Sequence, residues 1–348
     1  MNFASDNCGP AHPQVIDALA RANTGFARSY GSDDLTAQAA ARLRDLFEAP
    51  QADIHLVATG TAANALALAT LAQPWQAIYC TPLAHIHRDE CHAPEFYSGG
   101  AKLTPVGTGD KMTAADLARA IAASPPGDVG VSQPGPVSLT QVTEMGRLYT
   151  LTELSALTET AATHGLPVHL DGARFANALT VLGCTPADMT WKAGIDAVSF
   201  GGTKNGCLGV EAVIFFNPEK SWEFELRRKR AGHLLSKHRY LAAQMLAYLA
   251  DDLWLTSART ANARAARLAD GLRALPDCHF LAEPQANMIF ATLPRATHQR
   301  LHAAGAHYGL NGGPLETGDP DAPLPMRLVC DWSIAEESID RFLDIAKG

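Results

Sequence analysis

Short apolar runs alternate with segments of helical spacing along the first 220 residues or so of the chain. Apolar runs bounded by glycine, proline or polar turn residues are typical of buried strands. Such runs occur at residues 54–57, 77–80, 129–131, 136–139, 167–170, 195–200 and 213–216. Apolar positions three and four residues apart predict helices over residues 36–47, 61–71 and 151–164. The alternation predicts an α/β fold whose central sheet is mostly parallel.

The pattern changes after about residue 220. Long helical stretches rich in alanine and arginine cover residues 240–249 and 254–275, and short strands are predicted at 288–290 and 326–329. Residues 311–325 are dense in glycine, proline and aspartate, which predicts a loop. We therefore expect three parts. They are an N-terminal segment (residues 1–20), a large domain (21–249) and a smaller C-terminal α+β domain (250–348).

Composition narrows the class of protein. Of the 348 residues 47% are hydrophobic, so the chain can bury large cores. The net charge of −8, from 28 basic and 36 acidic residues, argues against a nucleic-acid partner. One short basic run, Arg227–Arg230, is the exception, and we expect it to form a solvated helix face.

The chain carries no predicted membrane segment and no disulfide framework. No apolar stretch approaches the ~18–20 residues that span a bilayer, and the first residues lack the pattern of a signal peptide. The seven cysteines are scattered, odd in number and without a CxxC pair. We therefore expect a cytoplasmic protein with reduced thiols and neither a membrane partner nor a structural metal site.

Lys204 is the first candidate for chemistry. It follows the apolar run at 195–200 and the residues Gly201, Gly202 and Thr203. Lysine side chains normally extend into water, but a lysine at the end of a buried strand loses solvation, which lowers its pKa. Such an amine can condense with a carbonyl group. A strand-end lysine that faces solvent is the alternative.

Three other predicted strands also end in polar residues. Gly60 and Thr61 begin an apolar helix whose free N–H groups could bind a phosphate, or Thr61 could simply cap the helix. His85 follows the strand at 77–80 and could stack on a planar ring or transfer protons. The polar residues around it also raise the possibility of a metal site, although their spacing matches no known ligand pattern. This cluster comprises His85, His87, Asp89, Glu90, Cys91 and His92.

Asp171 ends the strand at 167–170. A carboxylate there could keep a pyridine nitrogen protonated, or it could cap a helix over residues 173–182. Arg174 could bind a carboxylate with its planar guanidinium, or pair with a nearby acid. The carboxyl ends of parallel strands meet at one edge of a sheet, so these groups should lie together with Lys204. In combination they predict a pyridoxal-phosphate site.

Several segments then show a family resemblance. Residues 5–7, 30–33, 59–66, 84–86, 89–90, 169–178 and 200–206 resemble the low-specificity L-threonine aldolases, and residues 191–196 resemble their bacterial branch. The resemblance covers nearly the whole chain and implies a fold-type-I pyridoxal-phosphate enzyme. It implies retro-aldol cleavage of L-threonine, L-allo-threonine and other L-β-hydroxy-α-amino acids to glycine and an aldehyde. A homodimer or homotetramer is also implied.

The resemblance assigns a role to each candidate. Lys204 would hold pyridoxal 5'-phosphate as a Schiff base, Asp171 would pair with the ring nitrogen, and His85 would stack over the ring. We expect the catalytic base to be His85 or a water molecule that it orients. Gly60 and Thr61 would hold the phosphate, helped by Lys237 of a neighbouring subunit. The substrate carboxylate would be bound by Ser5, Arg174 and Arg327, with Arg174 also near the ring hydroxyl. A surface salt bridge is the alternative for Arg327.

Two positions depart from the family pattern. Many threonine aldolases carry a second active-site histidine in the stretch that corresponds to Gln141–Glu144, and His92 stands where relatives commonly have glycine. Both departures bear on the identity of the base and on the side-chain pocket. The alternatives are a phenylserine-preferring aldolase, a β-eliminating lyase of the same fold, a zinc hydrolase built on residues 85–92, and a non-catalytic binder of pyridoxal phosphate.

Overall fold

The computed structural model describes residues 1–348, and its larger part is built on a seven-stranded sheet. The strands are β1 (Asp53–Val57), β2 (Ala77–Cys80), β3 (Lys102–Pro105), β4 (Val137–Thr140), β5 (Val168–Gly172), β6 (Ala197–Gly201) and β7 (Glu211–Phe215). Their order is β1-β7-β6-β5-β4-β2-β3. β7 is antiparallel to both of its neighbours, and the other pairs are parallel. All strands except β7 therefore have their carboxyl ends at one edge.

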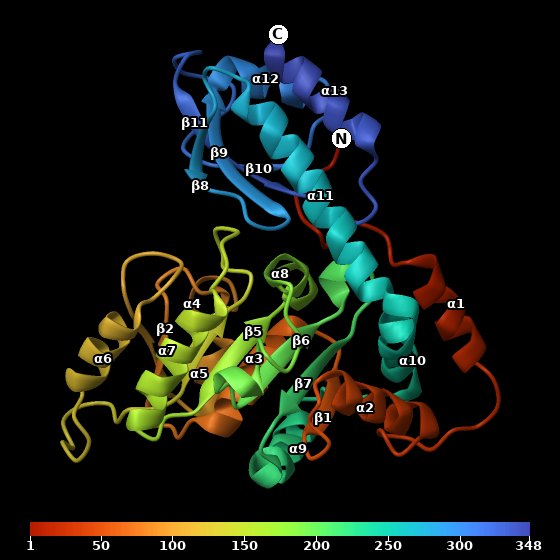
Figure 1. Ribbon diagram of the computed structural model, residues 1–348, viewed down its shortest axis with the longest axis vertical. Helices are drawn as coiled ribbons and strands as arrows, with labels where there is room; N and C mark the ends of the chain where they lie inside the picture. Colours follow the sequence, from red (N-terminus) through yellow and green to blue (C-terminus); the bar gives the residue numbers. More distant parts are fainter.

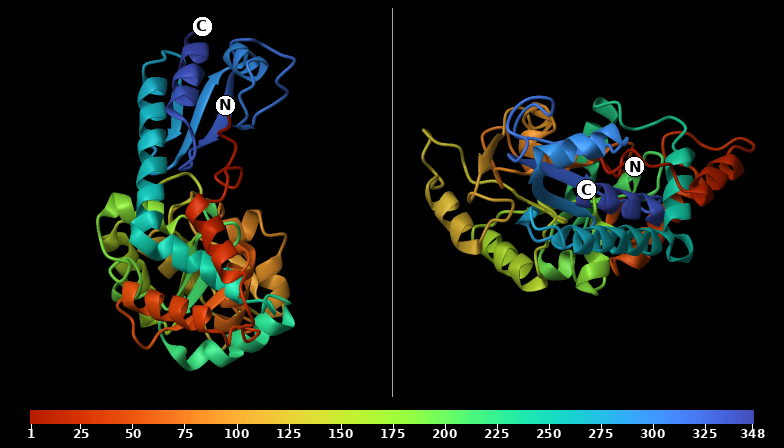
Figure 2. Two further views of the ribbon diagram at one scale, coloured as in Figure 1. Left: turned by 90° about the vertical axis from the view of Figure 1, so that its right-hand side faces the viewer. Right: turned by 90° about the horizontal axis from the view of Figure 1, so that it is seen from above.

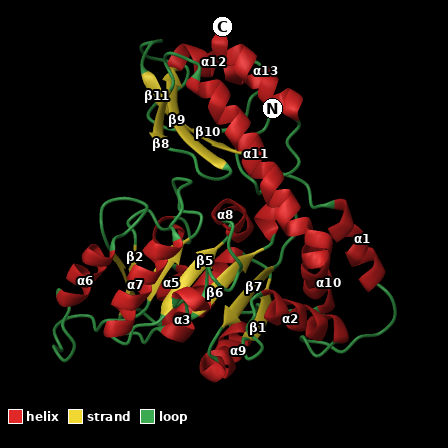
Figure 3. Ribbon diagram, in the orientation of Figure 1, coloured by secondary structure: helices red, strands yellow, loops and turns green.

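Helices cover both faces of this sheet (Figures 1 and 3). Because side chains alternate along a strand, Ala212 and Ile214 of β7 pack on one side, and Val213 and Phe215 on the other. The first face carries α2 (Asp34–Leu46), α7 (Leu151–Thr163), α8 (Phe175–Leu182) and α10 (Arg239–Leu249). The second carries α3 (Gly60–Leu71) and α9 (Ser221–Arg230). The shorter helices of this part are α4 (His85–Arg88), α5 (Ala93–Ser98) and α6 (Ala114–Ala122).

A second, antiparallel sheet lies in the C-terminal part of the chain, above the first in Figure 1. Its order is β10-β11-β9-β8, and it has its own hydrophobic core. The strands are β8 (His279–Ala282), β9 (Met288–Pro294), β10 (Gly309–Leu310) and β11 (Pro323–Val329). The helices α12 (Arg295–Ala303) and α13 (Glu336–Lys347) pack with it. The long helix α11 (Leu253–Arg273) runs from the large sheet to the small one (Figure 2).

The first residues of the chain connect the two parts. The Phe3 N–H donates to the carbonyl of His307 (2.7 Å), and the Phe3 carbonyl accepts from the Val329 N–H (2.8 Å). The Phe3 ring is fully buried in the small core. Ten residues later α1 (Pro13–Ala22) packs against α10 of the large part. The segment between them therefore passes between the two sheets.

The predicted fold class is confirmed. The apolar runs at 54–57, 77–80, 136–139, 167–170, 195–200 and 213–216 correspond to β1, β2, β4, β5, β6 and β7. The domain bounds at residues 20 and 249 stay a prediction. No helix is both long and apolar enough to cross a lipid bilayer.

Two predictions from the pattern were wrong. Residues 129–131 form a turn, in which Asp128 accepts a hydrogen bond from the Gly130 N–H (2.8 Å) and Val129 is fully exposed. The basic run at Arg227–Arg230 is only partly solvated. Arg228 is buried, donates to the Leu56 carbonyl (3.0 Å) and pairs with Glu225. Its position in α9 directs it towards the end of β1, which the local charge pattern does not reveal.

Candidate active site

Lys204 lies in a short 3₁₀ turn (Thr203–Asn205) directly after β6, at the carboxyl edge of the sheet. Burial lowers the pKa of the Lys204 ammonium, and the nearby Arg174 guanidinium lowers it further. The carboxylates of Asp6, Asp171 and Glu211 act in the opposite direction. The prediction that this lysine is a desolvated amine among charged groups agrees with this geometry, and the alternative of a solvent-facing lysine does not.

Glu211 is a member of this group that the sequence pattern did not suggest. It begins β7, is buried, and accepts a hydrogen bond from the Gly202 N–H (2.7 Å). Burial raises the pKa of Glu211 to about 7, although the hydrogen bond from Thr203 and the charge of Lys204 oppose the rise. This carboxyl group is thus poised to change its charge near neutral pH, close to Lys204.

Asp171 projects from the end of β5 and is buried. Its Oδ1 accepts from the Ala173 N–H (2.9 Å) and its Oδ2 accepts from Asn64 Nδ2 (2.8 Å). The alternative reading of Asp171 as a helix cap was wrong. The helix α8 begins at Phe175, and no side chain caps its first turn. Asp171 is therefore held in a fixed orientation by the protein, which suits a carboxylate that binds a ligand atom.

Asn64 connects Asp171 to His85 through a second carboxyl group. Its amide nitrogen also donates to Glu90 Oε1 (3.0 Å), and the same oxygen bonds to His85 Nδ1 (3.0 Å). The hydrogen bond to Glu90 raises the pKa of the His85 imidazole, while burial opposes the rise. His85 keeps 40% of its side-chain surface exposed, whereas the Glu90 side chain is fully buried. His85 thus presents its ring to open space from a buried anchor.

Glu144 fixes the backbone at His85. Its Oε1 accepts from the His85 N–H (3.0 Å) and from Thr140 Oγ1 (2.8 Å), and burial raises the pKa of Glu144 to about 7. Glu144 lies in the stretch where the resemblance led us to look for a second histidine. A second carboxyl group, not a second imidazole, therefore holds His85 in this chain.

Arg174 forms a bidentate ion pair with Asp6 of the N-terminal segment. The Nε···Oδ2 and Nη2···Oδ1 distances are 2.6 and 2.9 Å, and both side chains are almost fully buried. Asn287 Nδ2 also donates to Asp6 Oδ2 (3.1 Å). Burial alone would raise the pKa of Asp6, but the charges of Arg174 and Lys204 and the two hydrogen bonds hold it below its usual value. The sequence pattern identified Arg174 as a candidate site residue, but it did not single out its partner Asp6.

Arg327 has no such partner. Arg327 forms no salt bridge, and its Nη1 donates only to the Ala4 carbonyl (3.2 Å). Burial and the nearby charge of Arg174 lower the pKa of Arg327. The alternative of a surface salt bridge was therefore wrong. Ser5, next to Ala4, accepts a hydrogen bond from the Asn7 N–H (3.1 Å). Of the two guanidinium groups, only that of Arg174 is paired with a carboxylate, so the charge of Arg327 is available for an anionic ligand.

The first turn of α3 offers two free N–H groups. Thr59 caps the helix by accepting from the Ala62 N–H (3.2 Å), so the alternative that Thr61 is the cap was wrong. The N–H groups of Gly60 and Thr61 have no acceptor within the protein. No heavy atom lies within 4 Å of the position that a Cβ on Gly60 would occupy. This open helix end fits a phosphate group, which accepts from backbone N–H groups.

The remaining predicted residues lie apart from this group or form no site of their own. Lys237 is exposed, directly before α10, and forms no ion pair. Its predicted role depends on a neighbouring subunit and stays a prediction. The side chains of the polar residues at 85–92 point in different directions, since His92 pairs with Glu95 (3.2 Å) while Glu90 is buried. No three histidine, cysteine, aspartate or glutamate side chains lie close enough together to hold a metal ion.

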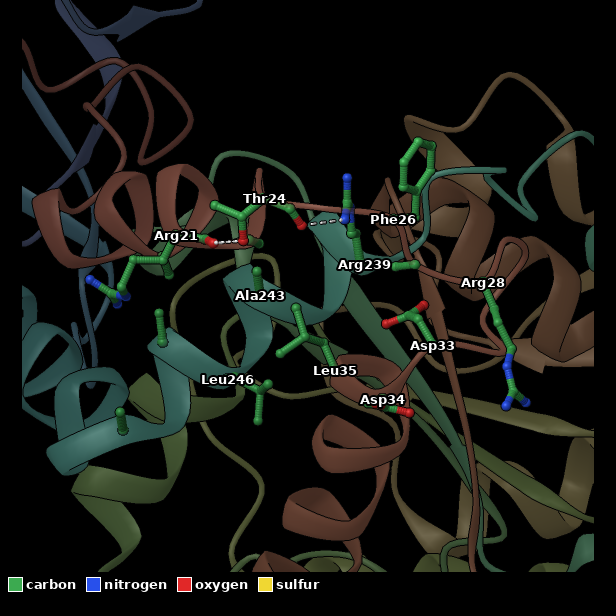
Figure 4. A pocket seen from close by; sticks show the side chains of 15 residues that line it. Arg21, Thr24, Phe26, Arg28, Asp33, Asp34, Leu35, Arg239, Ala243 and Leu246 are labelled. Carbon is green, nitrogen blue, oxygen red and sulfur yellow. Dashed lines mark hydrogen bonds between the residues drawn. The ribbon is translucent and has the colours of Figure 1, made fainter.

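A separate hollow of about 680 Å³ lies between α1, α2 and α10 (Figure 4). Arg21, Phe26 and Leu246 are among the residues that line it, and Arg239 donates across it to the carbonyls of Thr24 and Gly25. It contains none of the residues described above.

Comparison with known proteins agrees with this geometry. Residues 2–295 match the model of the β-eliminating lyase family. The chain is 41% identical to the low specificity L-threonine aldolase of Pseudomonas aeruginosa, over 99% of this chain and 96% of that protein. It is 39% identical to the low specificity L-threonine aldolase of Pseudomonas sp. strain NCIMB 10558, over 97% and 94%. The structure of Leishmania major threonine aldolase superposes with a TM-score of 0.92 at 29% identity, over 99% and 98% of the two chains.

The family resemblance read from the sequence segments is confirmed by these matches, because they extend over nearly the full length of both partners. The chain therefore belongs to the β-eliminating lyase family and, within it, to the low-specificity L-threonine aldolases.

Proposed function

We propose that this protein is a pyridoxal-phosphate-dependent carbon–carbon lyase. It cleaves L-threonine, L-allo-threonine and other L-β-hydroxy-α-amino acids to glycine and an aldehyde in a retro-aldol reaction. The observation that carries the proposal is the amine of Lys204, whose pKa is lowered at the sheet edge where its carboxylate neighbours include Asp171 and Asp6. The full-length similarity to low-specificity L-threonine aldolases supports the choice of substrate class.

The residues present fit the cofactor. The free N–H groups of Gly60 and Thr61 suit its phosphate, the fixed carboxylate of Asp171 suits its ring nitrogen, and the Lys204 amine suits its aldehyde. We propose these residues as its binding site, with Lys237 of the partner subunit adding a positive charge beside the phosphate. Pyridoxal phosphate, when bound, supplies an electron sink for the pair of electrons released when the Cα–Cβ bond breaks. Asp171, held by Asn64 and the Ala173 N–H, would keep a proton on the ring nitrogen and so stabilise that negative charge.

The substrate is oriented through its carboxylate. Arg327 has no anionic partner, and Arg174 shares its charge with Asp6, so these two guanidinium groups and the Ser5 hydroxyl would bind the α-carboxylate. Two planar guanidinium groups fix the direction of a carboxylate more firmly than one. With the carboxylate fixed, the direction of the Cα–Cβ bond would be fixed as well. His85 then removes the proton of the β-hydroxyl group, and the C–C bond breaks to release the aldehyde.

Product analysis tests this function. Purified protein with added pyridoxal phosphate is given L-threonine, L-allo-threonine or L-phenylserine, and glycine, aldehyde, 2-oxo acids and ammonia are measured. An aldolase yields equal amounts of glycine and aldehyde from each accepted substrate. A 2-oxo acid and ammonia without glycine would identify β-elimination instead; the 2-oxo acid is 2-oxobutanoate from the two threonines and phenylpyruvate from phenylserine. Cofactor binding without any product would identify a non-catalytic binder, and a preference for phenylserine would place the side-chain pocket among the aryl-accepting aldolases.

A matched variant links the activity to the amine. Lys204→Ala should abolish steady turnover and the visible absorbance of bound cofactor, since no other side chain here supplies a desolvated amine. Lys192→Ala is the control. Lys192 is an exposed lysine paired with Glu48, and its loss should leave both signals unchanged. Normal turnover in Lys204→Ala would refute the assignment.

We also propose a homodimer or homotetramer in the reducing cytoplasm. The exposed position of Lys237 supports a site shared between subunits, and the seven free cysteines are consistent with a reducing compartment. Light scattering of the protein with cofactor, and loss of cofactor affinity in Lys237→Ala, test the shared site.

A further inference from the structure

Glu90 is a buried carboxyl group beside the reacting centre to which the proposed reaction assigns no task. Its side chain has no exposed surface. One oxygen, Oε1, accepts from both His85 Nδ1 and Asn64 Nδ2 at 3.0 Å each. The other oxygen, Oε2, is buried without any partner. Burying a carboxyl oxygen without a hydrogen-bond partner costs folding free energy, so its presence here calls for a functional reason.

The hydrogen-bond chain fixes its own proton positions. Asn64 faces the carboxylates of Glu90 and Asp171, both of which accept, so its amide nitrogen and not its oxygen must point to them. Burial raises the pKa of Glu90, and the hydrogen bonds from His85 and Asn64 oppose the rise. When Glu90 is ionised, the same argument places a hydrogen on His85 Nδ1, because Nδ1 faces Glu90 Oε1. In the neutral imidazole the remaining nitrogen, Nε2, is then the one with the free lone pair.

We propose that Glu90 is a positioning residue that holds His85 in the Nδ1–H tautomer, so that Nε2 is the atom that takes the β-hydroxyl proton. Asn64 joins this pair to Asp171, which makes the base and the ring-nitrogen carboxylate one hydrogen-bonded unit. The inference rests on the proposed aldolase function and adds the atom that acts in it.

The charges around His85 agree with this assignment. Glu90 and Asp171 favour the protonated ring, Lys204 opposes it, and Glu144 binds only its backbone N–H group. The strongest of these influences is the hydrogen bond to Glu90. Removing the Glu90 charge while keeping its oxygen should therefore lower the pKa of His85 and leave the tautomer unchanged.

Two substitutions separate these effects. In Glu90→Gln the amide oxygen can keep both hydrogen bonds of Oε1, and the amide nitrogen takes the place of the unpartnered Oε2. In Glu90→Leu the acceptor is lost and the tautomer is no longer fixed. Glu95→Gln is the matched control, because Glu95 forms an equivalent bond to the exposed His92 (3.2 Å) outside the site.

The first readout needs no turnover. The ¹⁵N resonances of the His85 ring, assigned in the apoprotein by their loss in His85→Asn, report which nitrogen carries the hydrogen and at which pH the ring titrates. We expect the Nδ1–H form in the wild type and in Glu90→Gln, with the titration of Glu90→Gln moved to lower pH. In Glu90→Leu the Nδ1–H signature should disappear, and in Glu95→Gln nothing should change.

The second readout is the pH profile of kcat/KM for L-threonine. A base works when it is deprotonated, so activity rises as the pH passes the pKa of His85, and Glu90→Gln should move this acid limb to lower pH. Glu90→Leu should lower kcat by about 10²-fold, the lower end of what proton transfer contributes, with little change in KM. A fall in activity without movement of the acid limb in Glu90→Gln would overturn the proposal.

Failure of this inference and failure of the proposed function look different. If the wild type makes no aldehyde, the aldolase proposal fails while the ¹⁵N readout still measures the tautomer. If the wild type is an aldolase but its His85 ring carries hydrogen on Nε2 alone, only the role of Glu90 is refuted.

Discussion

Glu211→Gln measures the free-energy cost of burying the ionised Glu211 carboxylate beside Lys204. Glu211 is buried, accepts from the Gly202 N–H, and has its pKa raised to about 7 from a reference value of 4.5. Glutamine has the same shape but cannot ionise. The variant therefore removes the penalty of burying a negative charge while it keeps one acceptor for the Gly202 N–H.

The size of the effect follows from the two pKa values. An acid whose pKa is higher in the folded state than in the unfolded state destabilises the folded state when it ionises. For Glu211 this cost grows as the pH rises from 4.5 to about 7, and it is constant at higher pH. At 1.36 kcal/mol for each unit, a rise of this size costs about 3 kcal/mol at pH 8.5 but only about 1 kcal/mol at pH 5. The advantage of glutamine should thus grow by about 2–3 kcal/mol between these pH values.

Urea unfolding of the apoprotein measures this difference. The free energy of unfolding of both proteins is determined at pH 5 and pH 8.5, with the slope against urea checked for equality. Glu159→Gln is the control, because Glu159 is exposed on α7 and its replacement should change stability equally at both pH values.

An advantage of Glu211→Gln that does not change with pH would refute the reasoning, since it would mean that Glu211 keeps one protonation state throughout. If the stability advantage of Glu211→Gln increases with pH by less than this amount, the half-buried Lys204 ammonium stabilises the Glu211 carboxylate more strongly than we expect. The variant should also lower the pKa of Lys204 further, because the Glu211 charge raises that pKa.

Three other substitutions test separate parts of the structure. Asp6→Ala should lower the free energy of unfolding by about 3–5 kcal/mol in urea, because it leaves the buried guanidinium of Arg174 without a partner; a loss below 1 kcal/mol would contradict the buried pair. His92→Gly should raise the midpoint of thermal unfolding and add up to about 1 kcal/mol, because His92 has a left-handed backbone (φ 59°) that glycine adopts without strain. An unchanged or lower midpoint would show that the exposed bond to Glu95 matters more than the backbone. Asp171→Asn should lower kcat for L-threonine by about 10²–10³-fold at saturating cofactor, and full activity would exclude it from charge stabilisation.

The sequence alone predicted the parts of the site that depend on local pattern. Lys204, Asp171 and His85 each follow a short apolar run, and the parallel arrangement of those runs brings their ends together. The geometry of Gly60 and Thr61 at the start of α3 could also be predicted, because a helix end leaves its first N–H groups free.

The residues that sequence reasoning missed depend on partners far away in the chain. Asn64 lies 26 positions from Glu90 and 107 from Asp171, and Asp6 lies 168 positions from Arg174. No periodicity connects such positions. Arg228 was misread for the same reason, since the carbonyl that holds it is 172 residues away. Only the glycine expected by the family at position 92 pointed to an unusual feature, which is the left-handed turn that follows Glu90.

The contact between Ala4 and Arg327 has a consequence for biosynthesis. These residues are separated by 323 positions, so the carboxylate-binding region stays incomplete until nearly all of the polypeptide described here has left the ribosome. At about 5–20 residues per second, the early segment waits roughly 15–65 s for its partner. During that interval the carboxylate-binding region lacks the Arg327 guanidinium, so it cannot yet hold an anionic ligand between its two arginines.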